Sequence, residues 1–264
     1  MKILLLGDIV GRPGRNFLTA HLSGFVEKNH IDLVLANGEN ASGGAGITAK
    51  NALEISKAGV SGITLGDHVW DQKNFNNEID GLEYVCRPAN LPNTNPGRDR
   101  LILDANGTKL GLFTVLGRTF MGPKVDCPFA TADRIVSKLQ NSCDLIFAEI
   151  HAETTSEKEA MGWHLDGRVT MIYGTHTHVP TADLRILRSG SAYQTDLGMT
   201  GPRESVLGRD IDACLGRFVD GMPRRCPVAD GDVGMQGCLL EVNQQTGLPE
   251  SVELVNWRET DLNS

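Results

Sequence analysis

Side chains of the types that bind metal ions follow five short apolar segments of this chain. The segments and the residues after them are 3–6 before Asp8, 33–36 before Glu39 and Asn40, 62–65 before Asp67 and His68, 145–150 before His151, and 170–173 before His176 and His178. Apolar segments of this length, bounded by glycine and polar residues, predict buried strands of a parallel sheet. Ligand sites in such sheets lie outside the carboxyl ends of the strands. We therefore expect these side chains to converge, which indicates a metal-centred hydrolase.

The His-Thr-His sequence at 176–178 is the most specific local element. Alternate residues of an extended segment point the same way, so an extended backbone would direct both imidazoles at one site. A tight turn would instead direct them at two adjacent metal ions. Hard carboxylates combined with neutral imidazoles suit zinc, manganese or iron.

Other interpretations of single residues stay open at this point. Asp8 could cap the following helix, Glu39 could belong to a simple loop, and Asp67 could pair with a cation. Three side chains after strand candidates either contact phosphate or tie loops to the sheet, namely Arg87, Asn90 and Arg118. It is the joint placement of acids and histidines after several strands that favours a metal site.

The elements that must position these residues alternate between strand and helix. Apolar residues at intervals of three and four positions predict a helix over 17–26. A second helix is predicted over 48–58, with Thr48 as its cap and Leu53 and Ile55 facing inward. Segments 101–104 and 110–115 form a hairpin around Asn106-Gly107, and segments 184–187 and 192–195 form another. A helix over 131–139 and strands over 237–242 and 251–255 follow. We expect an α/β protein in which residues 1–264 form one domain with two packed sheets.

Composition excludes several classes of protein. The net charge of −8 excludes bulk electrostatic binding to nucleic acid or an anionic membrane surface. No apolar run approaches the roughly 18 residues of a membrane span. The six cysteines contain no CxxC pair, which argues against a zinc ribbon or a thioredoxin-type site and favours buried free thiols in the cytoplasm.

Several motifs resemble those of the calcineurin-like metallophosphoesterases, and more narrowly those of the YmdB-like branch. The wider superfamily is indicated by Gly7-Asp8, Gly66-Asp67-His68 and residues 174–178, and the branch by residues 7–11, 37–40, 151–153 and 195–202. The resemblance extends over essentially the whole chain. It implies a four-layer α-β-β-α sandwich of two mixed sheets. It also implies a dinuclear phosphodiesterase active on cyclic nucleotides, including 2′,3′-cyclic forms.

The resemblance assigns roles to individual residues. Asp8, Glu39, Asn40 and His178 would hold one metal, while Glu39 as a bridge, with Asp67, His151 and His176, would hold the other. His68 would be the general acid, and no residue is assigned to an organic cofactor. Iron is the expected metal, with manganese or zinc as alternatives. Two departures are Val10, where the wider superfamily has a ligand histidine, and Asp67, where the family normally has asparagine.

The predicted activity is hydrolysis of a small phosphodiester such as a 2′,3′-cyclic or 3′,5′-cyclic nucleotide. A hydroxide that bridges the metals would attack phosphorus, and His68 would protonate the leaving oxygen. Family members tend to self-associate, so a homo-oligomer is expected. One alternative is a metal-binding regulatory or scaffold protein with slow catalysis, and another is a metal hydrolase acting on an amide. A nucleotide-binding module at 44–49 is a poor match, because its glycines do not directly follow the strand.

Overall fold

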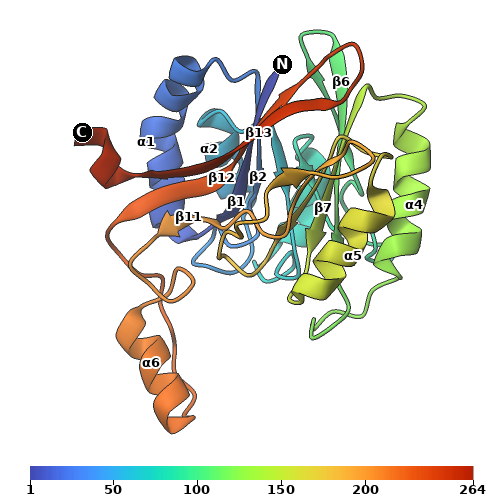
Figure 1. Cartoon of the computed structure of the whole chain (residues 1–264). Coiled ribbons are helices and arrows are strands. Elements are labelled where there is room, and N and C mark those ends of the chain that lie inside the picture. The colour runs from blue at the N-terminus through green and yellow to red at the C-terminus, as the bar shows by residue number, and fades with distance from the viewer. Residues whose placement is uncertain (264) are drawn as a thin grey trace.

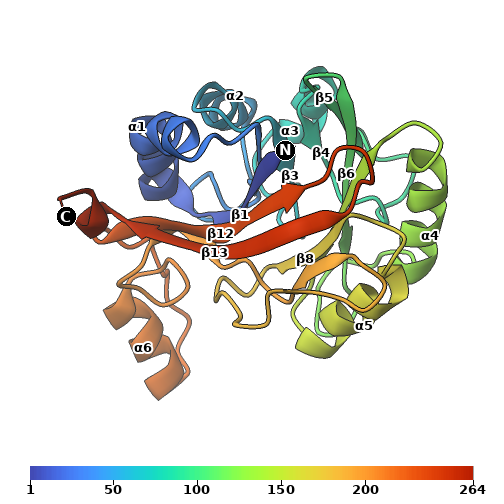
Figure 2. The same ribbon diagram turned by 45° about the horizontal axis from the view of Figure 1, so that its top comes forward.

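The computed structural model describes residues 1–263 and contains two mixed β-sheets (Figures 1 and 2). The strands of the first sheet are β1 (Lys2–Ile9), β2 (Leu33–Asn37), β3 (Gly62–Thr64), β4 (Val85–Cys86), β11 (Met199–Pro202), β12 (Val233–Val242) and β13 (Pro249–Arg258). Their order is β13-β12-β11-β1-β2-β3-β4, and β12 also pairs with β1. The strands of the second sheet are β5 (Leu101–Ala105), β6 (Thr108–Leu116), β7 (Leu145–His151), β8 (Met171–Thr175), β9 (Arg185–Ile186) and β10 (Ala192–Gln194). Their order is β5-β6-β7-β8-β10-β9.

The five predicted strands are all present, but they divide between the two sheets. Strands β1, β2 and β3 run parallel in the first sheet, and β7 and β8 run parallel in the second. The carboxyl ends of both parallel sets therefore have to meet if the candidate residues are to converge.

Helices cover the outer faces of both sheets. Helices α1 (Gly11–Asn29) and α2 (Ala49–Lys57) lie on the first sheet, and α4 (Pro128–Leu139) and α5 (Thr155–Leu165) lie on the second (Figure 2). The remaining helices are α3 (Phe75–Glu78), α6 (Ile211–Asp220) and 3₁₀ helices at Ile79–Gly81 and Glu259–Asn263. No helix among the described residues has the length and apolar character needed to cross a membrane.

Strand β1 contributes to two apolar clusters because both of its faces are buried. Leu4 and Leu6 pack in the cluster beneath α1 and α2, whereas Ile3 and Leu5 pack in the cluster between the two sheets. A third cluster lies between the second sheet and helices α4 and α5. Burial on both faces explains the uninterrupted apolar sequence of β1. The predicted four-layer sandwich of two mixed sheets is confirmed.

Most local predictions are confirmed, but the prediction that Leu53 faces inward is wrong. The Thr48 hydroxyl caps α2 by accepting a hydrogen bond from the Asn51 backbone N–H at 3.2 Å. Leu53, however, is 46% exposed, since the buried face of this helix is formed by Ala52 and Ile55, three residues apart. Both predicted hairpins are present, as β5–β6 and β9–β10, and the helix predicted over 131–139 is α4.

The cysteines are all free, as predicted, but they are not all buried. Cys86, Cys214 and Cys238 are buried, whereas Cys127 is exposed. The helix α6, which the sequence analysis did not identify, projects away from the rest of the molecule (Figure 1).

Candidate metal centre

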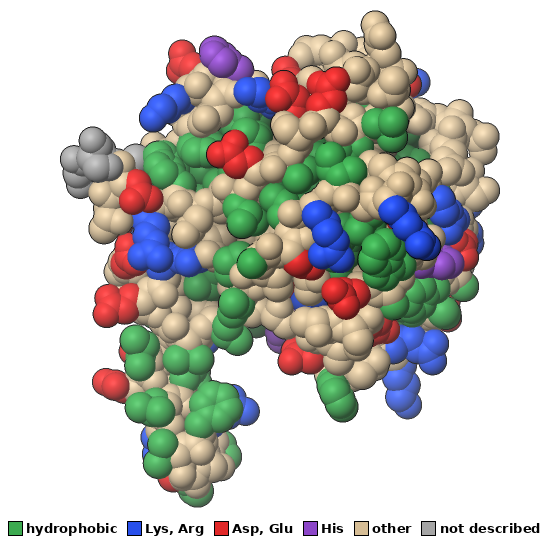
Figure 3. Space-filling view, viewed as in Figure 1, with side chains coloured by type: hydrophobic (Ala, Val, Ile, Leu, Met, Phe, Trp, Pro, Cys, Tyr) green, Lys and Arg blue, Asp and Glu red, His purple; other side chains and the backbone are tan. Residues whose placement is uncertain are grey.

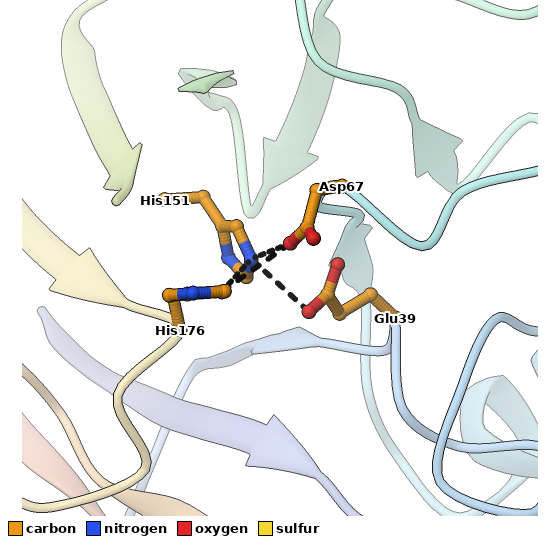
Figure 4. Close-up of side chains that lie close together, drawn as sticks. All are labelled: Glu39, Asp67, His151 and His176. Atoms are coloured by element: carbon orange, nitrogen blue, oxygen red, sulfur yellow. Dashed lines mark hydrogen bonds and ion pairs between the residues drawn. The ribbon is translucent and has the colours of Figure 1, made fainter. Parts of the chain in front are cut away.

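Four predicted ligands converge at the carboxyl ends of strands from both sheets. One ligand-type atom from each of Glu39, Asp67, His151 and His176 lies within 4.8 Å of the other three (Figure 4). His151 Nε2 lies 3.0 Å from Glu39 Oε1 and 3.0 Å from Asp67 Oδ1. His176 Nδ1 lies 3.1 Å from the same His151 nitrogen. This group therefore has the donor types and the spacing of a metal site.

The other three predicted ligands contact this group or each other. Asn40 Oδ1 lies 3.0 Å from His178 Nε2. Asp8 Oδ2 accepts a hydrogen bond from the His176 backbone N–H at 3.1 Å. The other Asp8 oxygen, Oδ1, is buried with no hydrogen-bond partner. A buried carboxylate oxygen without a partner is costly unless a cation completes it.

The histidine pair lies on a turn and not on an extended segment. His176 has φ of 90° and His178 has φ of 60°, in the left-handed region that few non-glycine residues adopt. As a result His176 faces Asp67, whereas His178 faces Asn40. Of the two backbone conformations that the sequence left open, the chain adopts the turn, which directs the two imidazoles toward different side chains. Backbone conformations of this kind are found preferentially at functional sites.

The imidazole of His151 is oriented by a buried relay. Thr175 Oγ1 donates its proton to Glu149 Oε1 at 2.5 Å. The hydroxyl must then accept from His151, whose Nδ1 lies 2.8 Å away. With a proton fixed on Nδ1, Nε2 is the nitrogen that faces the centre and would bind a metal in place of a proton, which is how metal-binding histidines are commonly held.

The other two histidines are held in the same manner. His176 Nε2 lies 3.1 Å from Glu153 Oε2, and His178 Nδ1 donates to the carbonyl of Leu207 at 3.1 Å. Their inner nitrogens therefore face oxygen atoms that are themselves acceptors. Asn40 directs its oxygen inward because its amide N–H donates to the carbonyl of Gly44 at 3.2 Å. A cation between acceptor atoms that face one another would stabilise them, so the residues fit a metal.

The pKa values in the centre reflect this concentration of negative charge. Burial raises the pKa of Asp8 to about 8. Burial opposes charge on His151, but the surrounding carboxylates, Glu39 above all, raise the pKa of its imidazole well above its usual range. Burial likewise opposes charge on Asp67, but hydrogen bonds from the imidazoles of His151 and His176 hold its pKa far below the ordinary value. Positive charge nearby stabilises the carboxylates of Asp8, Glu39 and Asp67. Two divalent cations would supply more of that charge than protons on the imidazoles do.

His68 lies at the edge of the centre and is not one of the inner ligands. Its backbone N–H donates to Glu39 Oε2 at 3.1 Å, and its Nδ1 lies 2.7 Å from Asp71 Oδ2. Its Nε2 is 3.9 Å from Asp67 Oδ2. Burial opposes charge on His68, but Glu39, Asp67 and Asp71 raise its pKa. The ring lines the cavity above the centre.

The structure decides several alternatives that the sequence left open. Asp8 is not a helix cap, because Val10 occupies the N-cap position of α1. The Arg87 guanidinium donates to loop carbonyls, including that of Pro96 at 3.1 Å, and the Asn90 amide donates to the Leu116 carbonyl at 2.8 Å. These two side chains therefore tie loops to the sheet. The exposed Arg118 is positioned through its backbone N–H, which donates to a glutamate.

Sequence reasoning missed the side chains that support the ligands. Asn37 Oδ1 accepts from the Glu39 backbone N–H at 2.9 Å, while Asn37 Nδ2 donates to Glu149 Oε1 at 2.6 Å. Asn37 lies within a motif that the resemblance includes, but Glu149 lies inside an apolar strand with no local signal of its role. The fully buried Lys158 contacts Asp196 Oδ2 at 2.7 Å. No sequence pattern marks Lys158 as buried, because it lies in a helix among other polar residues.

Comparisons with known proteins give matches over nearly the whole chain. The model of the YmdB-like protein family matches residues 4–255. A Bacillus subtilis protein described as a 2′,3′-cyclic-nucleotide 2′-phosphodiesterase is 40% identical over 255 residues, which cover 97% of this chain and 96% of that protein. A crystal structure of a hypothetical protein from Thermus thermophilus has a TM-score of 0.91 and 37% identity, covering 98% of this chain and 100% of that one. The crystal structure of a Mycoplasma pneumoniae phosphatase has a TM-score of 0.91 and 35% identity, covering 100% of this chain and 96% of that one. The chain therefore belongs to the YmdB-like protein family.

Proposed function

We propose that this protein is a dinuclear-metal phosphodiesterase that hydrolyses a small cyclic phosphodiester, with 2′,3′-cyclic nucleotides as the first candidates. The observation that carries the proposal is the set of three imidazoles, each held from outside so that its other nitrogen faces acceptor atoms of the centre. The name of the Bacillus subtilis relative supports the substrate class. A 3′,5′-cyclic nucleotide is the alternative substrate.

The ligands divide into two sets that share Glu39. Asp8, Asn40 and His178 would complete one set, and Asp67, His151 and His176 would complete the other. Glu39 is suited to the shared position because Oε1 faces His151, while its carboxylate is oriented by the His68 backbone N–H on Oε2. Asp8, Glu39 and Asp67 together contribute a charge of −3 against +4 from two divalent ions. Iron is the proposed metal, with manganese or zinc as alternatives.

His68 is the proposed general acid. Bound metal ions would polarise the phosphate and lower the pKa of the attacking water. The contact of Nδ1 with Asp71 leaves Nε2 as the nitrogen able to carry a proton toward the substrate. As water adds to phosphorus and the bond from phosphorus to the ribose 2′-oxygen breaks, Nε2 would give its proton to that oxygen. The product would then be a nucleoside 3′-phosphate.

The test combines metal analysis with hydrolysis. Protein loaded with iron or manganese should bind two ions per chain and hydrolyse bis-p-nitrophenyl phosphate and 2′,3′-cyclic AMP, and a chelator should abolish both reactions. His151→Ala should lose metal and activity, whereas His21→Ala serves as a control because His21 lies on α1, where it packs against Phe17 of the same helix and Trp257 of β13. Two bound ions without turnover of any phosphodiester would support a regulatory or scaffold role instead. Failure to bind metal would contradict both functions.

A test of the acid role compares leaving groups. His68→Ala should lose much more activity on 2′,3′-cyclic AMP, whose alkoxide leaves poorly, than on an aryl ester whose phenolate needs no proton. Equal losses on both substrates would contradict the acid role while leaving the metal centre intact.

A further inference from the structure

The cavity above the metal centre is bounded on its far side by a projecting segment, residues 206–226, which we call the arm. The arm includes helix α6, and the surface is hollowed between the arm and the body (Figure 3). The cavity has a volume of about 590 Å³, within the range of small-molecule sites. Residues of the metal centre, including Glu39, His176 and His178, form one wall. Leu207, Arg217 and Phe218 of the arm belong to the opposite wall.

The base of the arm is fixed to the body beside the metal centre. The Arg209 guanidinium donates to the carbonyls of Gly43 at 3.2 Å and Gly44, and the Gly44 carbonyl also accepts from Asn40. The Leu207 carbonyl accepts from His178. The arm is therefore joined to two proposed ligands, and its helix is positioned relative to them.

Two side chains of α6 that line the cavity have no partner within the described part of the chain. Phe218 is 81% exposed, and no other aromatic ring of residues 1–263 lies against it. The neighbouring Arg217 guanidinium has no hydrogen-bond or ion-pair partner among those residues. A nucleobase in this cavity could stack on the exposed phenyl ring. Its polar edge could accept hydrogen bonds from the unpaired guanidinium.

We propose that Phe218 stacks on the base of the nucleotide whose phosphate is bound at the metal centre, with Arg217 donating to the polar edge of that base. The inference rests on the proposed function and adds to it the subsite for the nucleoside. Every base offers a π-face, so stacking on Phe218 confers preference for nucleotides over simple phosphodiesters with weak discrimination among bases.

Other exposed apolar residues of the arm provide the matched control. Val219 is 78% exposed on the same helix but does not line the cavity, and the same holds for Leu215, which is 56% exposed. If the apolar surface of α6 instead binds a second copy of the chain, Val219→Ala and Phe218→Ala should act alike. If Phe218 binds the base, only Phe218→Ala should affect nucleotides.

The experiment measures kcat and KM of the metal-loaded full chain for 2′,3′-cyclic AMP and for glycerol 1,2-cyclic phosphate, which has the same reacting group but no base. Phe218→Ala should raise KM for the nucleotide by about 5- to 100-fold, the range expected for loss of one stacked base. The loss on the glycerol ester should be at least fivefold smaller. Phe218→Trp should restore the nucleotide KM to within about twofold of the wild type, because an indole also stacks.

Binding gives a readout that does not depend on turnover. Titration calorimetry should show that Phe218→Ala weakens binding of adenosine 3′-monophosphate by a similar factor and binding of inorganic phosphate far less. Equal losses on the two substrates, or equal effects of Val219→Ala and Phe218→Ala, would overturn the inference and leave the proposed function standing. If the loaded wild type hydrolyses neither substrate, the proposed function fails and the inference fails with it.

Discussion

The buried pair of Lys158 and Asp196 gives a quantitative prediction about both stability and the metal centre. Both side chains have no exposed surface, and Lys158 Nζ lies 2.7 Å from Asp196 Oδ2. At that separation the attraction is about 6 kcal/mol for an effective dielectric constant of 20, most of which offsets the cost of removing two charges from water. Lys158→Met would keep the volume and leave the Asp196 charge without a cation. We expect a loss of about 3–5 kcal/mol in the free energy of unfolding.

The same substitution should also disturb the histidine turn. Asp196 Oδ2 accepts from both the backbone N–H and the hydroxyl of Thr177, at 3.3 and 2.6 Å, and Thr177 lies between the two proposed histidine ligands. Lys158 therefore supports the turn in two ways, through Asp196 and through its own Nζ, which donates to Thr177 Oγ1 at 3.2 Å. We expect metal affinity to fall by about 10- to 100-fold, as it does when residues supporting metal ligands are changed.

Urea unfolding in the presence of a chelator measures the stability effect without a contribution from bound metal. In a thermal melt under the same conditions, the melting temperature should fall by about 6–20 °C. The double variant Lys158→Met/Asp196→Asn should recover much of the loss, because it removes the unpaired charge. Lys50→Met, at an exposed position of α2, should change stability by no more than about 0.5 kcal/mol. A loss below about 1 kcal/mol for Lys158→Met, or additive effects in the double variant, would refute this reasoning.

Three further predictions concern single substitutions. Gly66→Ala should abolish metal binding, since an added Cβ would overlap Glu39 Oε2 and His151 Nε2. Gly24→Ala should be tolerated, because nothing lies within 4 Å of a Cβ added there. Metal analysis of both variants tests this, and a Gly66→Ala protein with full metal content would contradict the geometry. Asp67→Asn removes one carboxylate and should therefore weaken metal affinity. It should also raise kcat, because the ions become stronger Lewis acids. Tighter metal binding by the variant in a chelator competition would contradict this prediction. Burial opposes charge on Asp183, but hydrogen bonds, including that from the Thr195 hydroxyl at 2.6 Å, lower its pKa. Its stabilising contribution should therefore be complete above about pH 4 and disappear as pH falls through the lowered pKa, so the unfolding free energies of wild type and Asp183→Asn should converge in acid. A difference that does not shrink as pH falls below about 4 would exclude this origin.

The sequence by itself determined the local elements and the chemical types at the site. Thr48 was identifiable as a helix cap and Asn106-Gly107 as a hairpin turn, because a cap and a turn depend on a few neighbouring residues. The ends of the buried strands were readable from apolar segments that stop at a carboxylate or a histidine. Helix α6 also carries local signals that were overlooked, namely the Asp210 cap and the left-handed Gly221 that ends it.

Only the tertiary structure decided which atoms meet. Asn40 and His178 are separated by 138 positions, and Asp8 and His176 by 168, so no local pattern could assign them to neighbouring sets. The orientation of each imidazole depends on an outer partner such as Thr175, whose distance from His151 is set by the pairing of β7 with β8. The placement of α6 over the cavity likewise depends on contacts between the arm and the distant glycine loop. Residue type follows from the sequence, whereas the direction of a lone pair and the partner of a buried charge are properties of packing between segments far apart in the chain.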